Sequence, residues 1–239
     1  MKKKNIKYIL LIVLLSIFII VVLFPKNKET VKDKNNNIEP VKESVEYRDK
    51  PITKQILHNP NNRIIIDNIL DKRLMDDDGE YYYLNHNLEG RYDEVGVPFV
   101  DYRTNFETRK TLIYAHSTLA GNGPFQVLQN YHNNKAFYDE HKYIDITYND
   151  KEYHYEIFSV ALSLADNEKS PELEYFHTTE YYDSDWEKII QWYKSKSEYD
   201  TGVEVSKTDK ILILQTCILD PDYYEKYYRY NILIFAKKI

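Results

Sequence analysis

Cysteine is almost absent from this sequence, because Cys217 is the only one among 239 residues. A single cysteine excludes an intrachain disulfide and any cysteine-rich metal cage. Basic residues are also too few to outweigh the acidic ones, and the formal net charge is −6. A chain of this charge is a poor partner for nucleic acid, whose phosphates attract basic surfaces. Disulfide scaffolds, cysteine–zinc proteins and nucleic-acid binders are therefore set aside.

Internal repeats are absent, and low complexity is confined to a Lys-, Asn- and Glu-rich stretch over residues 26–50. A stretch with so few large apolar residues cannot bury a core, so it is expected to be a solvated tether. Asp76-Asp77-Asp78-Gly79 has part of the composition of a calcium loop. It lacks the alternating ligand positions and the distal glutamate, which favours a solvated turn.

An apolar run of 17 residues, Tyr8 to Phe24, follows four lysines at the N-terminus. A helix of that length spans roughly 26 Å, the short end of what crosses a membrane. The lysines would stay in the cytoplasm and leave the rest of the chain outside. Small residues typical of a signal-peptide cleavage site do not follow the run, so an uncleaved anchor is favoured. The expected division is a cytoplasmic tip and single membrane anchor in 1–25, an extracellular tether in 26–50 and a catalytic domain in 51–239.

Short apolar runs rich in β-branched and aromatic residues indicate that the domain is mainly β. The expected strands cover residues 80–84, 95–100, 110–114, 143–148, 153–164, 211–214 and 229–236. Asn149-Asp150 is expected to turn a hairpin between the fourth and fifth of these.

Helices are expected at three places. The apolar residues of 52–74 have loosely helical spacing, which predicts one or two short helices, or a helix followed by a strand at Arg63–Asp67. Phe125 to Tyr131 is expected to be a short helix. A longer helix opens at Ser184, capped by Asp183 or Ser184, and lies between two strands.

The last two apolar runs carry the candidate site. The first leads into Gln215-Thr216-Cys217, and the second opens at Arg229. In an antiparallel hairpin Cys217 and Arg229 would meet at the same end of the sheet. The thiolate is the nucleophilic form of cysteine and a nearby positive charge favours it, so the pair is a candidate reactive site. The simpler alternative is a buried, inert thiol, since free cysteine is among the most buried residues.

A cysteine nucleophile needs a second group that moves protons, and seven histidines are available. Only His116 directly follows an apolar strand, in Leu112-Ile113-Tyr114-Ala115-His116. A strand end presents a side chain to a cleft from a rigid scaffold, so His116 is the best partner for Cys217.

This constellation resembles the sortases, the cysteine transpeptidases of Gram-positive cell surfaces. Leu214-Gln215-Thr216-Cys217 matches the Thr-Leu-x-Thr-Cys of that family, Tyr114-Ala115-His116-Ser117 matches its Tyr-Gly-His-Asn, and Arg229 opens the final strand. Within the family, the stretches 82–87 and 96–103 and the helix from Ser184 look like class B.

The resemblance implies a closed or nearly closed β-barrel of about eight strands, with N-terminal helices and one long inserted helix. It implies that Cys217 attacks a sorting signal after Thr, that His116 moves protons and that Arg229 stabilises the oxyanion. The thioester would pass to a peptidoglycan amine, or in some relatives to a pilin amine. Neither metal nor organic cofactor is implied. The implied substrate-binding residues are Tyr114, Gln215, Thr216, Asn85 and Asn87.

The sequence departs from the family pattern around both predicted catalytic residues. Ala115 and Ser117 replace a glycine and an asparagine, and Gln215 and Ile218 flank Cys217 where smaller or more polar residues are common. Two alternatives follow. A cysteine hydrolase of papain type is disfavoured because His116 precedes Cys217 in the chain. A membrane-anchored binding or pilus-associated module that kept the barrel and lost activity would explain the substitutions.

Overall fold

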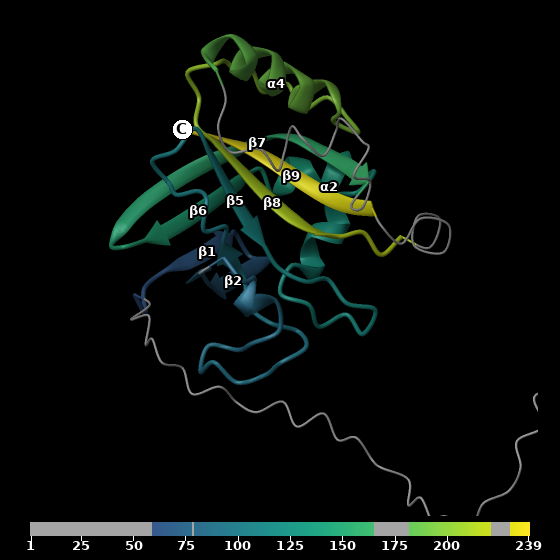
Figure 1. Ribbon diagram of the computed structural model, residues 1–239. Coiled ribbons are helices and arrows are strands. Elements are labelled where there is room, and N and C mark those ends of the chain that lie inside the picture. The colour runs from purple at the N-terminus through teal and green to yellow at the C-terminus, as the bar shows by residue number, and fades with distance from the viewer. Residues whose placement is uncertain (1–58, 78, 165–181, 221–229) are drawn as a thin grey trace, which may run out of the picture. The chain divides into compact units, whose positions relative to one another are not determined.

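The computed structural model describes residues 59–77, 79–164, 182–220 and 230–239 (Figure 1). The chain divides into Met1–Arg48 and Asp49–Ile239, and every described residue belongs to the second unit. The expected membrane segment Tyr8–Phe24, the start of the expected N-terminal helices at 52–58 and the predicted catalytic Arg229 lie outside the described residues.

In the described part of the chain, one mixed sheet of nine strands has the order β2-β1-β6-β7-β9-β8-β5-β4-β3. It curls into a nearly closed barrel, which agrees with the mainly β fold expected from the sequence (Figure 1). The strands are β1 Arg63–Ile66, β2 Leu70–Arg73, β3 Met75–Asp76, β4 Phe99–Val100, β5 Lys110–Tyr114, β6 Tyr143–Tyr148, β7 Lys151–Leu164, β8 Ile211–Cys217 and β9 Tyr230–Lys238.

Four helical elements accompany the sheet within the described ranges: η1 Tyr82–Leu84, η2 Gln126–Tyr131, α2 Lys135–Glu140 and α4 Asp183–Ser195. The expected short helix at 125–131 is confirmed as η2, and the expected inserted helix between two strands is confirmed as α4. The predicted cap of α4 was wrong. The N-cap is Tyr182, and Asp183 already lies in the first turn, where a carboxylate is favoured by the positive end of the helix dipole.

Two expected elements differ from the structure. Residues 63–73 form the β1–β2 hairpin, so the strand alternative at Arg63 was right and the helical reading of this part was wrong. The reason is the alternation in β1, where Ile64 and Ile66 are fully buried and Arg63 is exposed. The strand expected at 80–84 is instead η1, because Tyr81 takes a left-handed conformation with φ 52° that ends the extended chain.

The central strands are buried on both faces. Leu212 and Leu214 of β8 belong to a cluster shared with η2 and α2, whereas Ile211 and Ile213 belong to a second cluster shared with α4. Each buried aliphatic side chain contributes about 1.5–3 kcal/mol. Because side chains alternate along a strand, Cys217 shares the face of Ile211 and Ile213. We call this the α4 face; α4 packs over it (Figure 1).

Candidate active site

His116 and Cys217 lie at the same end of two neighbouring strands. β5 and β8 are parallel, with Tyr114 in register with Gln215. The Ala115 N–H donates to the Gln215 carbonyl at 3.3 Å, so the two chains stay side by side as β5 ends. His116, which follows Ala115, and Cys217, the last residue of β8, are therefore neighbours at this end of the two strands.

A main-chain carbonyl supports the His116 side chain. The imidazole is half-buried and hydrogen bonds to the backbone of Leu84, in η1. Burial lowers the pKa of His116, and the bond to Leu84 opposes that shift by favouring the protonated ring. At neutral pH the imidazole is therefore uncharged and can accept a proton.

The Cys217 side chain is exposed at the end of β8. Nevertheless, the protein atoms packed around the sulfur displace enough water to raise the pKa of the thiol. Together with the lowered pKa of His116, this favours a neutral thiol beside a neutral imidazole.

Gln129 in η2 ties the two strand ends together. Its Nε2 donates to the Cys217 carbonyl at 2.8 Å and to Ser117 Oγ at 3.1 Å, and its Oε1 accepts from the Leu219 N–H at 2.8 Å. Thr216 Oγ1 also donates to Ser117 Oγ, at 3.0 Å. No local signal in the sequence points to this role, because a glutamine in a short helix is normally a surface residue.

Asn231 is the residue of β9 that stands opposite Cys217. It is 5% exposed, and a polar residue directly before the apolar run 232–236 is a signal in the sequence for a functional position. Arg229, the residue expected in this role, lies outside the described residues and stays a prediction.

Tyr114 and Gln215, both predicted to bind substrate, lie on the α4 face with Cys217. Tyr114 is 7% exposed, and its hydroxyl donates to Asp101 Oδ2 at 3.0 Å. Burial would raise the pKa of Asp101, but hydrogen bonds from Arg103, one at 2.6 Å, hold it below the usual range. Tyr114 is therefore a buried structural residue on this face, whereas Gln215 is half-buried and closer to solvent.

The other three residues predicted to bind substrate differ in burial and in hydrogen bonding. Thr216 is buried on the face of β8 opposite Cys217, and its hydroxyl donates to Ser117 Oγ. Asn87 organises its own turn, since its Oδ1 accepts from the N–H groups of Glu89 and Arg91. Asn85 is exposed directly after η1, where its side chain is accessible to a ligand.

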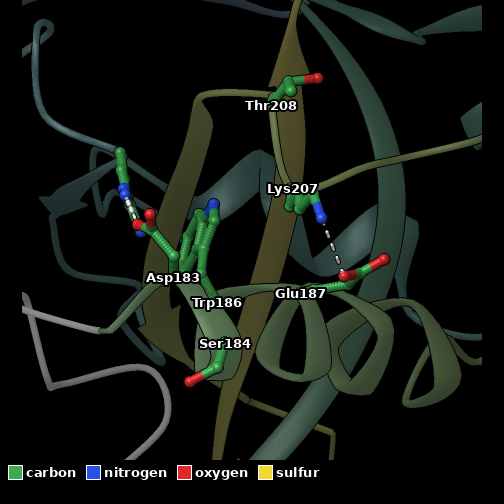
Figure 2. A pocket seen from close by; sticks show the side chains of 7 residues that line it. Asp183, Ser184, Trp186, Glu187, Lys207 and Thr208 are labelled. Carbon is green, nitrogen blue, oxygen red and sulfur yellow. Dashed lines mark hydrogen bonds and ion pairs between the residues drawn. The ribbon is translucent and has the colours of Figure 1, made fainter.

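A separate hollow of about 370 Å³ lies between the start of α4 and the segments that enter β5 and β8. Figure 2 shows Glu187 beside Lys207, with Asp183 on the other side of Trp186. Asp183 pairs with Arg109, and Lys207 pairs with Glu187 at 3.5 Å. β5 and β8 begin at this hollow, and His116 and Cys217 lie where the two strands end. The hollow is therefore at the opposite end of the strands from the cysteine and the histidine.

Across 59–77, 79–164, 182–220 and 230–239, His, Cys, Asp and Glu side chains form no group of three placed to bind a metal ion. Within those ranges no helix is long and apolar enough to cross a membrane.

The fold and this strand-end pair define a β-barrel protein with a cysteine–histidine site. No family model matches the chain. The sortase B of Listeria monocytogenes is 33% identical over 162 residues, 66% of this chain and 62% of that protein. The sortase B of Staphylococcus aureus is 29% identical over 138 residues, 56% of this chain and 53% of that protein. The solved sortase B of Clostridium perfringens superposes with a TM-score of 0.64 and 26% identity, covering 76% of this chain and 95% of that chain.

These likenesses support the assignment of the chain to class B of the sortase family. The chain matches less than two thirds of the length of the curated relatives, 62% and 53%. The likeness therefore extends to the barrel as well as to the sequence.

Proposed function

We propose that this chain is a cysteine transpeptidase that cleaves a sorting signal after threonine and joins the freed carboxyl to a cell wall amine. The observation that carries the proposal is the placement of Cys217 and His116 at the ends of adjacent parallel strands in a sortase B barrel. A thiol and an imidazole so placed form a nucleophile and a proton carrier.

Acylation of Cys217 is the first half of the proposed reaction. The thiol gives its proton to His116, and the sulfur forms a bond to the carbonyl carbon of the threonine. The carbonyl π electrons move to oxygen, giving a tetrahedral oxyanion. When that pair returns, the C–N bond breaks, and His116 donates its proton to the leaving amine. The product is a thioester on Cys217 and a free peptide amine.

Resolution of the thioester reverses these roles. An incoming amine attacks the thioester carbonyl, and His116 takes its proton. The C–S bond then breaks, the sulfur is reprotonated, and a new amide bond remains. The neutral imidazole favoured by burial is the form that can accept this proton. Arg229 is proposed to bind substrate and to stabilise the oxyanion through its guanidinium.

The substrate and acceptor follow by analogy with relatives. A sortase B has been solved with triglycine, and the Staphylococcus aureus sortase B has been solved as a complex with its substrate. We propose surface proteins with a sorting signal as donors and a peptidoglycan precursor or cross-bridge amine as acceptor. Tyr8–Phe24 is proposed as a single-pass anchor that holds the enzyme at the outer face of the membrane.

A peptide-exchange assay tests the proposal. The full chain is incubated with peptides of the Asn-Pro-x-Thr-Asn, Ser-Pro-x-Thr-Gly and Leu-Pro-x-Thr-Gly kinds, together with triglycine. We expect one peptide to be cut after threonine and joined to triglycine, as read by mass spectrometry. Folded protein that binds a peptide but never cuts it would instead support the binding or pilus-associated module.

A further inference from the structure

The register of the last hairpin puts Asn231 directly opposite Cys217. Just beyond this pair, the Ile218 N–H donates to the Tyr230 carbonyl at 3.1 Å. In an antiparallel ladder, hydrogen-bonded and non-hydrogen-bonded pairs alternate. Cys217 and Asn231 are thus a non-hydrogen-bonded pair, the kind whose Cα atoms lie about 4.5 Å apart and whose side chains approach most closely.

Both side chains project from the α4 face. Directly opposite residues in a ladder share a face, and Ser163 of β7 is in register with Asn231 on its other side. The row across the sheet is therefore Ser163, Asn231 and Cys217. Asn231 is 5% exposed, and within the described residues its amide makes no hydrogen bond. The ladders to β7 and β8 fix the backbone of Asn231, and its side-chain amide remains able to donate.

We propose that Asn231 is a catalytic residue whose side-chain amide donates to the scissile carbonyl oxygen. This deepens the proposed function and rests on acyl transfer at Cys217. As the sulfur bonds to the carbonyl carbon, the π pair moves to oxygen, and the Asn231 N–H hydrogen bonds to that oxyanion. Asn231 transfers no proton. The pair then returns to carbon, and the C–N bond breaks with the proton supplied by His116.

An asparagine suits this buried position for a physical reason. Burying a neutral amide without a partner costs less than burying a guanidinium, which would have to lose the hydration of a full charge. A preorganised donor acts where charge develops and needs no reorganisation during reaction. The amide therefore gains its hydrogen bond in the transition state, which is when binding accelerates the chemical step.

Substitution of Asn231 tests the role, with Ser163→Ala as the neighbouring control. Acyl-enzyme formation is followed by intact-mass spectrometry at saturating peptide, using the full chain. Asn231→Ala is expected to lower the acylation rate about 100- to 1000-fold, the usual loss for one oxyanion donor, with KM little changed. Alkylation of Cys217 by iodoacetamide forms no oxyanion, so its rate should change less than about threefold. Ser163→Ala should keep the acylation rate within about threefold of wild type, because Asn231 lies between Ser163 and Cys217 in the sheet.

Asn231→Asp adds a readout that a packing role would not move. Its protonated carboxyl can donate and its carboxylate cannot, so acylation relative to wild type should fall as pH rises through the pKa of the new carboxyl. Unchanged acylation in Asn231→Ala, or an equal loss in Ser163→Ala, would overturn the proposal. If the wild-type chain forms no adduct with any peptide, the proposed function fails instead, and the two failures are thereby distinguished.

Discussion

The side-chain amide of Gln129 donates to the main-chain carbonyl of Cys217 at 2.8 Å. The same amide group bonds Ser117 Oγ and the Leu219 N–H. One side chain in η2 thus holds the backbone that follows the Cys217 side chain and the residue next to His116. This link joins the two strand ends that carry the thiol and the imidazole.

Gln129→Glu is expected to lower the acylation rate about tenfold or more, because a carboxylate cannot donate to the Cys217 carbonyl and repels it. The matched control is Gln126→Glu, one turn earlier in η2, where Oε1 accepts from the Thr118 N–H at 2.9 Å and the carboxylate can do the same. Acylation kinetics and thermal unfolding should both be measured. Equal acylation rates for the two variants would contradict the link.

Gly96→Ala should be far more damaging than Gly202→Ala. Both glycines have positive φ, so both substitutions share a backbone cost of about 1–2 kcal/mol. A Cβ at Gly96 would lie 2.4 Å from the Leu84 carbonyl oxygen, whereas nothing lies within 4 Å of one at Gly202. Displacement of that carbonyl would remove the backbone support of His116. Thermal unfolding and acylation rate check this, and similar losses in both variants would count against it.

Arg103→Ala is expected to destabilise the fold by about 3 kcal/mol, because it leaves the fully buried Asp101 carboxylate without its ionic partner. The matched control is Arg63→Ala, whose partner Asp71 is solvent-exposed, so a far smaller loss is expected. Chemical denaturation gives both values. The destabilisation caused by Arg103→Ala should be smaller in acid, where Asp101 becomes protonated. The ion pair lowers the pKa of Asp101, so it contributes stability only above that pKa.

The reactivity of Cys217 should rise with pH beyond the range of an ordinary cysteine. Burial raises the pKa of the thiol and lowers that of His116, so at pH 7 the pair is neutral and little thiolate is present. The iodoacetamide rate should climb tenfold per pH unit past pH ~8.5, the ordinary thiol pKa. His116→Ala should leave that slope intact. A plateau below pH 7 that His116→Ala abolishes would instead reveal a stable thiolate–imidazolium pair.

The sequence predicted the strands that carry the site and left their register open. The apolar runs predicted β5 with its observed bounds, whereas the predicted strand 211–214 ended three residues before β8 does. Twelve residues separate Cys217 from Tyr230, and a connection of that length does not fix which residues pair. The sequence therefore favoured the charged Arg229, whereas the structure sets Asn231 opposite the thiol.

Long-range contacts account for the other supporting residues. Gln129 lies 88 residues before Cys217, and no local pattern shows which face of η2 meets the end of β8. The tyrosines before Leu84 resemble a strand, but Tyr81 breaks the extended backbone and the following 3-10 turn carries the carbonyl that meets His116. Both features depend on how distant segments pack, which single-residue propensities do not encode.

The most direct measurement is the intact mass of the full chain after brief incubation with each sorting-signal peptide. One peptide should add the mass of an acyl group to wild-type protein, and hydroxylamine should remove it, as expected for a thioester. Cys217→Ala should gain no mass, and His116→Ala should gain it far more slowly. An adduct that persists in Cys217→Ala, or no adduct on folded wild-type protein with any peptide, would contradict the assignment of Cys217 as the nucleophile.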